Sequence, residues 1–273
     1  MLASHVWNSE WPGVSSSTSG AVIGPGFSNL GNTCFLNATL QCLCYSPAFA
    51  QCLVLSAGGG YGGKFAGFVR EMLERVHGVG MHSKKKVGKV GKQLDFNGGM
   101  NGNHAISPSS IVTNIRLLGK QFKIGRQEDA HEFLVHLLDA LQKGELLSCG
   151  IDVRKSGWRD RLPIPRLDET TLVSRIFGGY YRSQVTCTKC NHKSNTYDPF
   201  LDLALEVSDK RVNSVEQAIN NFTKKETLDK SNRWKCSGCG KLVCATKELT
   251  VFRPPLTLCI QLKRFSFGSG GGG

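Results

Sequence analysis

The sequence of 273 residues lacks any apolar run that approaches the roughly 18 residues of a membrane span. Its N-terminal segment lacks a basic start followed by an apolar core, so a secretory signal is not expected. No segment repeats at a fixed period, which excludes repeat architectures. With 40% apolar and 20% charged residues, the chain is expected to fold as one substantial domain or two small ones. We therefore expect a soluble protein that is neither secreted nor membrane-bound.

Cysteine is too sparse for a disulfide-stapled protein, since it accounts for 11 of the 273 residues, and the count is odd. These numbers favour reduced thiols in an intracellular compartment over a disulfide framework. Some of the thiols are then expected to bind metal or to act in catalysis.

Acidic residues are outnumbered, with 21 Asp and Glu against 34 Lys and Arg. The imbalance is concentrated between Lys64 and Lys92, where Glu71 and Glu74 are the only acidic residues before Asp95. This stretch supplies +6 of the net charge of +13. The lysine-rich part, about residues 77–104, is predicted to be an exposed inserted loop. Such a loop could bind nucleic acid, but a solvated insertion without a partner is the expected interpretation.

The N-terminal half is predicted to be mainly helical. Residues 1–25 are rich in Ser, Gly and Thr and are expected to form a flexible lead-in. Residues 26–55 are apolar with a helical pattern, and glycines then interrupt them before a short helix predicted over residues 65–76.

The clearest helix is predicted to begin at Gln127, with Glu128 and Asp129 in its first turn, where the helix dipole favours acidic groups. Apolar residues recur at helical spacing along one continuous stripe that consists of Ala130, Phe133, Leu134, Leu137, Leu138 and Leu141.

The pattern changes to period two beyond Thr170. Alternation over residues 201–207 predicts a half-buried antiparallel strand, and residues 258–262 alternate in the same way. Helices that precede strands favour an α+β protein over alternating βαβ units.

Two Cys-x-x-Cys pairs predict a metal site. Each pair can place two thiolates about 2.3 Å from one Zn²⁺, and two pairs complete a tetrahedron without an open position. Zinc would therefore be structural, as in a zinc ribbon. Cys244 and His192 are weaker alternative ligands. The four predicted ligands are Cys187, Cys190, Cys236 and Cys239.

Cys34 stands at the predicted start of an apolar helix, with Asn32 or Thr33 as the N-cap. The positive end of a helix dipole favours the thiolate, and backbone N–H groups there can stabilise an oxyanion. Asn29 could direct its side-chain amide at the same oxyanion. Cys34 is thus placed to act as a nucleophile for acyl transfer, but from these residues alone a buried structural cysteine is the favoured interpretation. The same structural role is expected for Cys42, Cys44 and Cys52.

Five motifs in this order resemble those of the ubiquitin-specific proteases, a papain-like family of deubiquitinating enzymes. The resemblance covers residues 26–267. The motifs are Gly26-Phe-Ser-Asn-Leu-Gly-Asn-Thr-Cys34-Phe-Leu-Asn37, Gln127-Glu-Asp-Ala-His-Glu-Phe133, Phe177-Gly-Gly-Tyr-Tyr-Arg-Ser183 with the following Cys-x-x-Cys, Tyr197-Asp-Pro-Phe-Leu-Asp-Leu203 and Leu258-Cys-Ile-Gln-Leu-Lys-Arg-Phe265.

The resemblance implies a papain-like α+β fold with thumb, palm and fingers. Residues 26–273 would be the catalytic domain, with a helical thumb over 26–145, and fingers with the zinc ribbon plus an incomplete palm over 171–273. Ubiquitin and ubiquitylated proteins would be the partners, at an intracellular site in the nucleus, including the nucleolus, or the cytoplasm. The implied roles are nucleophile for Cys34, oxyanion donor for Asn29, and contacts to the arginine-bearing ubiquitin tail for Gln127, Asp129, Glu132 and Phe265.

A general base is missing from the sequence. In this family the catalytic His and its orienting Asn or Asp follow the motif that ends at Phe265, but no histidine follows His192. The chain as given is therefore predicted to be a fragment of an active deubiquitinase, with residues 258–265 left as an open hydrophobic edge. A ubiquitin-binding pseudoenzyme and, less favoured, a zinc-ribbon nucleic-acid binder are the alternatives.

Overall fold

The computed structural model describes residues 24–55, 63–77 and 105–264. The chain divides into two compact units, residues 1–173 and 174–273. Nearly all of the predicted lead-in and basic insertion, together with Phe265, lies outside the described residues. Within those residues, no helix combines the length and the apolar character needed to span a bilayer.

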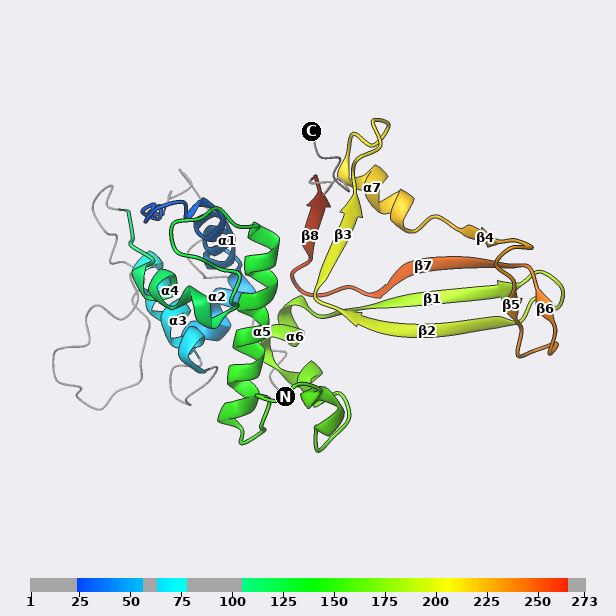
Figure 1. Ribbon diagram of the computed structural model, residues 1–273, viewed down its shortest axis with the longest axis horizontal. Coiled ribbons are helices and arrows are strands. Elements are labelled where there is room, and N and C mark those ends of the chain that lie inside the picture. Colours follow the sequence, from blue (N-terminus) through cyan, green and yellow to red (C-terminus); the bar gives the residue numbers. More distant parts are fainter. Residues whose placement is uncertain (1–23, 56–62, 78–104, 265–273) are drawn as a thin grey trace, which may run out of the picture. The chain divides into compact units, whose positions relative to one another are not determined.

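The first unit is helical (Figure 1), as its sequence pattern predicts. The predicted helix over residues 65–76 is confirmed as α3. Three short 3-10 turns, η2 (Ile115–Leu117), η3 (Trp158–Arg161) and η4 (Leu167–Thr170), connect its elements. The α-helices are α1 (Cys34–Cys44), α2 (Pro47–Leu55), α3 (Gly63–His77), α4 (Ser109–Asn114) and α5 (Ala130–Ser148), and α6 (Leu172–Phe177) crosses the unit boundary.

The core of the first unit forms where α5 packs against α1 and α3. Leu36 and Leu40 on α1 are fully buried, as is Phe133 on α5. The Phe133 ring meets the ring of Phe35 edge to face at 5.7 Å and that of Phe122 at 6.2 Å. Because Phe35 and Phe133 lie in the first turns of α1 and α5, their contact holds the start of one helix beside the start of the other.

The helix α5 begins at Ala130, so the prediction of a start at Gln127 is wrong by three positions. Asp129 is the N-cap residue, with extended backbone, and its carboxylate accepts hydrogen bonds from the N–H groups of His131 and Glu132. Asp129 therefore lies outside the first turn and satisfies two of the N–H groups that a helix start leaves without a partner.

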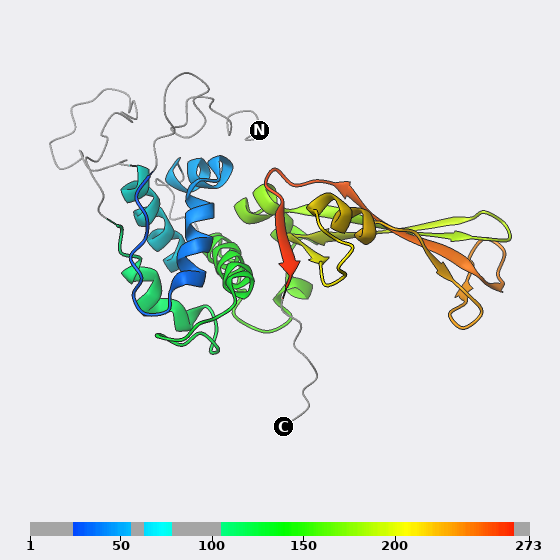
Figure 2. The same ribbon diagram turned by 90° about the horizontal axis from the view of Figure 1, so that it is seen from above.

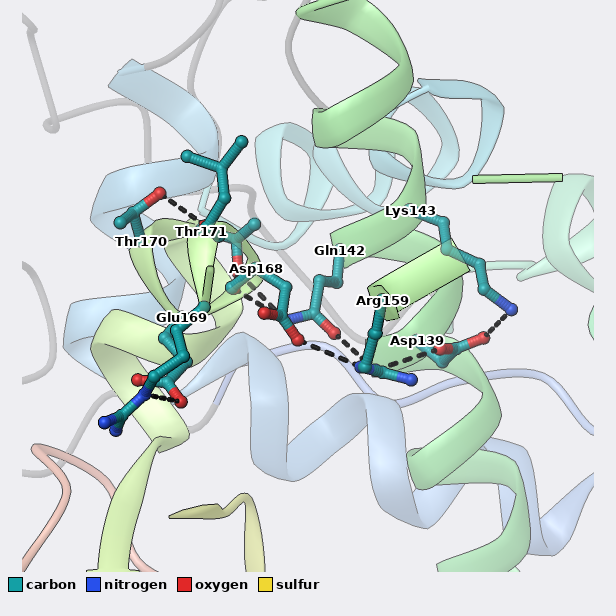
Figure 3. A network of polar contacts seen from close by, with 10 residues as sticks. Asp139, Gln142, Lys143, Arg159, Asp168, Glu169, Thr170 and Thr171 are labelled. Atoms are coloured by element: carbon teal, nitrogen blue, oxygen red, sulfur yellow. Dashed lines mark hydrogen bonds and ion pairs between the residues drawn. The ribbon is translucent and has the colours of Figure 1, made fainter. Parts of the chain in front are cut away.

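Gln142 anchors the segment after α5 to the helix (Figure 3). It is buried, and its Nε2 donates to the carbonyl oxygen of Asp168 at 2.8 Å and to Thr171 Oγ1 at 3.2 Å. Arg159 donates to Asp168 Oδ2 at 2.9 Å and to Gln142 Oε1 at 3.4 Å. The network holds residues 159–171 against α5 through the buried Gln142 and Thr171 and the more exposed Arg159.

We expect the substitution Gln142→Leu to lower the free energy of unfolding by about 2 kcal/mol, because it leaves buried donors and acceptors without partners at nearly constant volume. Lys143→Gln is the matched control. Its exposed ion pair with Asp139, at 2.6 Å, should contribute less than about 0.5 kcal/mol. Chemical denaturation measures both values, and equal effects of the two substitutions would contradict the anchoring role.

The second unit is built around an antiparallel sheet in the order β2-β1-β7-β4. Figure 1 and Figure 2 show β1, β2 and β7 side by side as a long ribbon, with the two-stranded sheet β5–β6 at its end. The helix α7 (Val215–Phe222) interrupts the strands. They are β1 (Gly179–Cys187), β2 (Lys193–Phe200), β3 (Asp202–Glu206), β4 (Glu226–Leu228), β5 (Trp234–Lys235), β6 (Leu242–Val243), β7 (Ala245–Arg253) and β8 (Cys259–Lys263).

The strand β3 pairs in parallel with β8, so the prediction of an antiparallel strand over residues 201–207 is wrong in its pairing. Its half-buried character is confirmed, since Leu203 and Leu205 are buried and pack with Ala218 of α7. Alternation reports only that one face is covered, and it is the same for both strand directions. Leu258 and Ile260 are more than one-third exposed, in agreement with the predicted hydrophobic edge.

Candidate catalytic loop and metal centre

The loop before α1 is organised by the side chain of Asn29. Its Oδ1 accepts hydrogen bonds from the N–H groups of Gly31 and Thr33, both at 3.1 Å, and from Thr33 Oγ1 at 3.2 Å. Thr33 Oγ1 in turn accepts from the N–H of Leu30. With the oxygen of the Asn29 amide held on the loop side, its Nδ2 donor group points away from these contacts.

Cys34 is the first residue of α1 and is exposed. Thr33 is the N-cap residue, but it makes no capping hydrogen bond, because its hydroxyl is used by Asn29 and Leu30. The first N–H groups of α1 therefore lack a side-chain acceptor, and they remain available to a negatively charged oxygen beside the thiol. A nucleophile and hydrogen-bond donors thus lie at the same helix end.

Asn32 joins this loop to a second loop, 93 positions further along the chain. Its backbone has φ 54, and its Nδ2 donates to the carbonyl oxygen of Gly125 at 2.8 Å. Gly31 and Gly125 have positive φ as well, and a Cβ added to Gly31 would lie 4.0 Å from the Gly125 Cα. The contact connects the Cys34 loop to the loop that leads into α5.

We expect Asn32→Asp to lower the free energy of unfolding by about 1 kcal/mol, because Asp tolerates the left-handed backbone but cannot donate to the Gly125 carbonyl. Gly125→Ala should destabilise the same loop through its φ of +81, although space is open around it. Thermal unfolding measures both effects. A midpoint for Asn32→Asp equal to that of the unmodified chain would show that the hydrogen bond adds no stability.

The predicted tail-binding residues are gathered near the start of α5. Gln127 is exposed in the loop before the helix, Asp129 is its N-cap, and Glu132 is exposed in its first turn. The hydroxyl of Thr39 on α1 donates to the carbonyl oxygen of Ala130 at 3.3 Å, which holds this helix start against α1. The two carboxylates therefore lie on the same unit as Cys34, whereas Phe265 lies outside the described residues.

Glu132 belongs to a hydrogen-bonded chain that the sequence does not predict. Gln121 Nε2 donates to Glu132 Oε1 at 3.0 Å and lies 2.8 Å from His136 Nε2. His136 Nδ1 lies 3.0 Å from the carbonyl oxygen of Leu118, which can only accept. The network therefore assigns the proton to Nδ1 and leaves Nε2 to accept from Gln121.

The four predicted metal ligands meet in the second unit. The sulfur atoms of Cys187, Cys190, Cys236 and Cys239 all lie within 4.8 Å of one another and could hold a metal ion. Cys187 ends β1, and Cys236 follows β5 directly. Each pair thus sits at a strand end.

Backbone hydrogen bonds reach one thiol of this cluster, that of Cys187. The N–H groups of Cys190 and Lys189 donate to Cys187 Sγ at 3.4 and 3.3 Å, and they lower the pKa of this thiol to about 7. His192, an alternative ligand in the sequence, lies outside the cluster, and its Nε2 is 3.0 Å from Ser237 Oγ. Cys244, the other alternative, lies outside it too, and its carbonyl oxygen accepts from Thr188 Oγ1.

The other cysteines of α1 and α2 differ in their surroundings. Cys44 is buried, as predicted, and this burial raises the pKa of its thiol to about 12. Cys52 is half-buried. Cys42 is exposed, so the prediction of a buried cysteine there is wrong.

Three of the described histidines, His77, His136 and His192, make side-chain contacts with groups other than Cys34. His77 Nε2 lies 2.9 Å from the carbonyl oxygen of Cys44, and burial lowers the pKa of His77. His136 and His192 make the contacts given above. Their hydrogen bonds give no general base to Cys34.

Comparison with known proteins places these features in a family. Residues 25–270 match the family model described as ubiquitin carboxyl-terminal hydrolase. The chain is 38% identical to ubiquitin carboxyl-terminal hydrolase 42 of Homo sapiens over 250 residues, which cover 91% of this chain and 16% of that protein. It is also 38% identical to ubiquitin carboxyl-terminal hydrolase 23 of Arabidopsis thaliana, covering 89% of this chain and 25% of the relative.

The fold is shared with a solved deubiquitinase. The structure of the SAGA Ubp8/Sgf11/Sus1/Sgf73 DUB module bound to ubiquitin aldehyde aligns with a TM-score of 0.65 at 21% identity. The alignment covers 97% of this chain and 52% of the solved chain. The chain therefore has the fold of that catalytic domain and spans only part of each of these proteins.

Proposed function

The chain belongs to the ubiquitin carboxyl-terminal hydrolase family, and from this premise we propose that it supplies the nucleophile half of a cysteine-type deubiquitinase. The reaction is hydrolysis of the bond after the C-terminal glycine of ubiquitin on protein conjugates. The observation that carries the proposal is the exposed Cys34 thiol at a helix start without a side-chain cap.

In the proposed reaction the Cys34 thiolate attacks the carbonyl carbon of the terminal glycine and a tetrahedral oxyanion forms. The N–H groups at the start of α1 and the Asn29 Nδ2 would donate to that oxyanion, because Oδ1 is already held by Gly31 and Thr33. Collapse of the intermediate releases the amine, which takes a proton, and leaves a thioester that water then hydrolyses.

The proton on the thiol must pass to a base, and an imidazole is the usual acceptor in such enzymes. The contacts of His77, His136 and His192 do not support any of them in this role. The proposed mechanism therefore assigns the general base to none of these three histidines. A ubiquitin-binding protein without hydrolase activity is the alternative outcome.

The acidic groups at the start of α5 are proposed to bind the ubiquitin tail. That tail carries arginine and ends in Gly-Gly, and carboxylates form strong charge-assisted hydrogen bonds with guanidinium groups. Glu132 keeps one oxygen on Gln121, and Asp129 Oδ1 caps the helix, so each carboxylate has a second oxygen for a ligand. Gln127 lies in the loop that precedes them.

The test is ubiquitin binding to the chain as it stands, measured by calorimetry. The double substitution Asp129→Asn with Glu132→Gln removes both charges but keeps the helix cap and the acceptor for Gln121. We expect at least a tenfold loss of affinity, compared with little change for the control Glu128→Gln. Ubiquitin without its arginine-bearing tail should bind the variant and the unmodified chain equally. Undiminished affinity for intact ubiquitin would contradict the assignment.

The four-cysteine cluster is proposed to hold structural Zn²⁺. Four thiolates at about 2.3 Å from zinc lie about 3.8 Å apart. Cys190 Sγ and Cys236 Sγ are 3.6 Å apart, and all four sulfurs fall within 4.8 Å of one another, which supports this ion. Four protein ligands leave no position for water or substrate, so zinc would stabilise the end of the ribbon and take no part in hydrolysis.

We also propose which part of a deubiquitinase each unit forms and where in the cell the protein acts. The helical unit would be the thumb, and the unit with the cysteine cluster would contain the fingers and part of the palm. None of the eleven cysteines is paired in a disulfide, which supports an intracellular location in the nucleus or cytoplasm.

A further inference from the structure

The end of the long ribbon in the second unit carries a concentration of positive charge. The first Cys-x-x-Cys pair lies in the turn between β1 and β2, and the second lies between β5 and β6, so the metal cluster brings two short basic segments together. Figure 2 shows these strands at the end of the ribbon. We call the cations of the two segments the basic tip. They are Lys189, Lys193, Lys230, Arg233, Lys235 and Lys241.

The basic tip is exposed and is not neutralised by neighbouring carboxylates. All six side chains are exposed, and none forms an ion pair with a described residue. The only acidic residue within the two segments is Asp229, whose carboxylate accepts from the Ser231 hydroxyl and N–H. The hydrogen bond from the Ser231 hydroxyl lowers the pKa of Asp229. Its carboxylate therefore stays ionised, but it binds Ser231 and forms no ion pair with a cation of the basic tip.

Beside the tip, two lysines are paired with carboxylates. Lys247 lies 3.4 Å from Glu226, and Lys225 lies 3.9 Å from Glu248. These two lysines are thus neutralised by glutamates on neighbouring segments of the chain, whereas none of the six cations of the basic tip has an ion-pair partner among the described residues. A bound Zn²⁺ with four thiolates would contribute −2 beneath the surface and would leave the tip positive.

We propose that the basic tip binds the phosphate backbone of nucleic acid without reading its sequence. Five of the six cations are lysines, which act as flexible point charges and suit a repeating line of phosphates. The net charge of +13 favours association with a polyanion as well. The proposal does not depend on the hydrolase function.

The lysine-rich insertion over about residues 77–104 offers an internal control of equal charge. One variant carries Lys189→Gln, Lys193→Gln, Lys235→Gln and Lys241→Gln, and the matched variant carries Lys84→Gln, Lys85→Gln, Lys86→Gln and Lys89→Gln. Both lower the net charge by the same amount, so a difference between them reports position. Metal content and thermal unfolding verify that both variants keep the fold.

The measurement is fluorescence anisotropy of the full chain with a labelled oligo(dT) at several salt concentrations. We expect the tip variant to bind at least tenfold more weakly at low salt and its log–log salt slope to decrease by about 3, since each phosphate contact on a single strand contributes about 0.7. The insertion variant should lose less than threefold. Equal losses in both variants, a loss only in the insertion variant, or absence of binding by the unmodified chain would overturn the proposal.

A second arm separates nucleic acid from an acidic protein partner. Poly-glutamate of the same charge as the oligonucleotide is added as competitor. We expect it to displace the oligonucleotide at least tenfold less effectively than unlabelled oligo(dT). Equal competition would mean that the tip accepts any polyanion and would overturn the assignment to nucleic acid. Ubiquitin binding to the same variants is an independent measurement, so failure of the proposed hydrolase function would leave this result unaffected.

Discussion

Replacement of Cys34 by alanine is expected to abolish ubiquitin release in a longer chain that includes the general-base histidine. The loss should be roughly 10⁴-fold or more, because without the thiolate neither the tetrahedral intermediate nor the thioester can form. Ubiquitin affinity should remain within about threefold of the unmodified chain, since the alanine removes one sulfur atom at an exposed position. Release of a fluorophore from a ubiquitin C-terminal amide measures the rate.

Cys42→Ala is the matched control, because Cys42 is exposed near the other end of the same helix. We expect its activity to equal that of the unmodified chain. Substantial turnover by the Cys34 variant, or an equal loss in both variants, would show that the reaction does not depend on this thiol.

Removal of the metal is expected to unfold the end of the ribbon and to lower the thermal midpoint of the second unit by roughly 10 °C or more. Structural zinc sites contribute on the order of 10 kcal/mol, and one kcal/mol shifts the midpoint of a domain of this size by about 4 °C or more. The apolar cluster around Cys187 and Cys236 is small and adds Val243, Trp234 and Cys239. The small sheet β5–β6 cannot compensate for the loss.

Cys236→Ser should reproduce the effect of a chelator, whereas Cys244→Ser, which alters a nearby cysteine outside the cluster, should change the midpoint little. Elemental analysis should give one zinc per chain for the unmodified protein and the Cys244 variant, and less for the Cys236 variant. A stable Cys236 variant with an unchanged midpoint would contradict a structural metal site.

Local patterns predict most of the elements but not their boundaries or partners. The apolar stripe of α5 is visible in the sequence, yet the helix starts three residues later than predicted because Asp129 adopts an extended backbone and caps it. Helical spacing tolerates an acidic residue equally well at the cap and in the first turn, so the pattern alone does not separate the two.

Strand pairing is the part of the fold that the pattern leaves undetermined. Leu203 and Leu205 are buried as predicted, but their strand pairs with β8 rather than with a neighbour in the sequence. The partner arrives after α7 and four other strands, and the direction of pairing depends on that path. Alternation over five residues contains no information about it.

The candidate site was predicted to different degrees in its two parts. Cysteine spacing alone identified all four members of the metal cluster, since two Cys-x-x-Cys pairs together supply the four ligands of a tetrahedral site. The connections around Cys34 could not be predicted, because Asn32 and Gly125 are far apart in the sequence. Gln121, Glu132 and His136 likewise meet only through the packing of a loop on α5.

The most direct test of the central claim is reaction of the longer chain with ubiquitin that carries an electrophile in place of its C-terminal carboxylate. Intact mass followed by peptide mapping identifies the modified residue among the eleven cysteines. The account predicts one ubiquitin per chain, attached to Cys34 and absent from the Cys34→Ala variant. Attachment to a different cysteine, or no adduct under conditions in which ubiquitin binds, would contradict it.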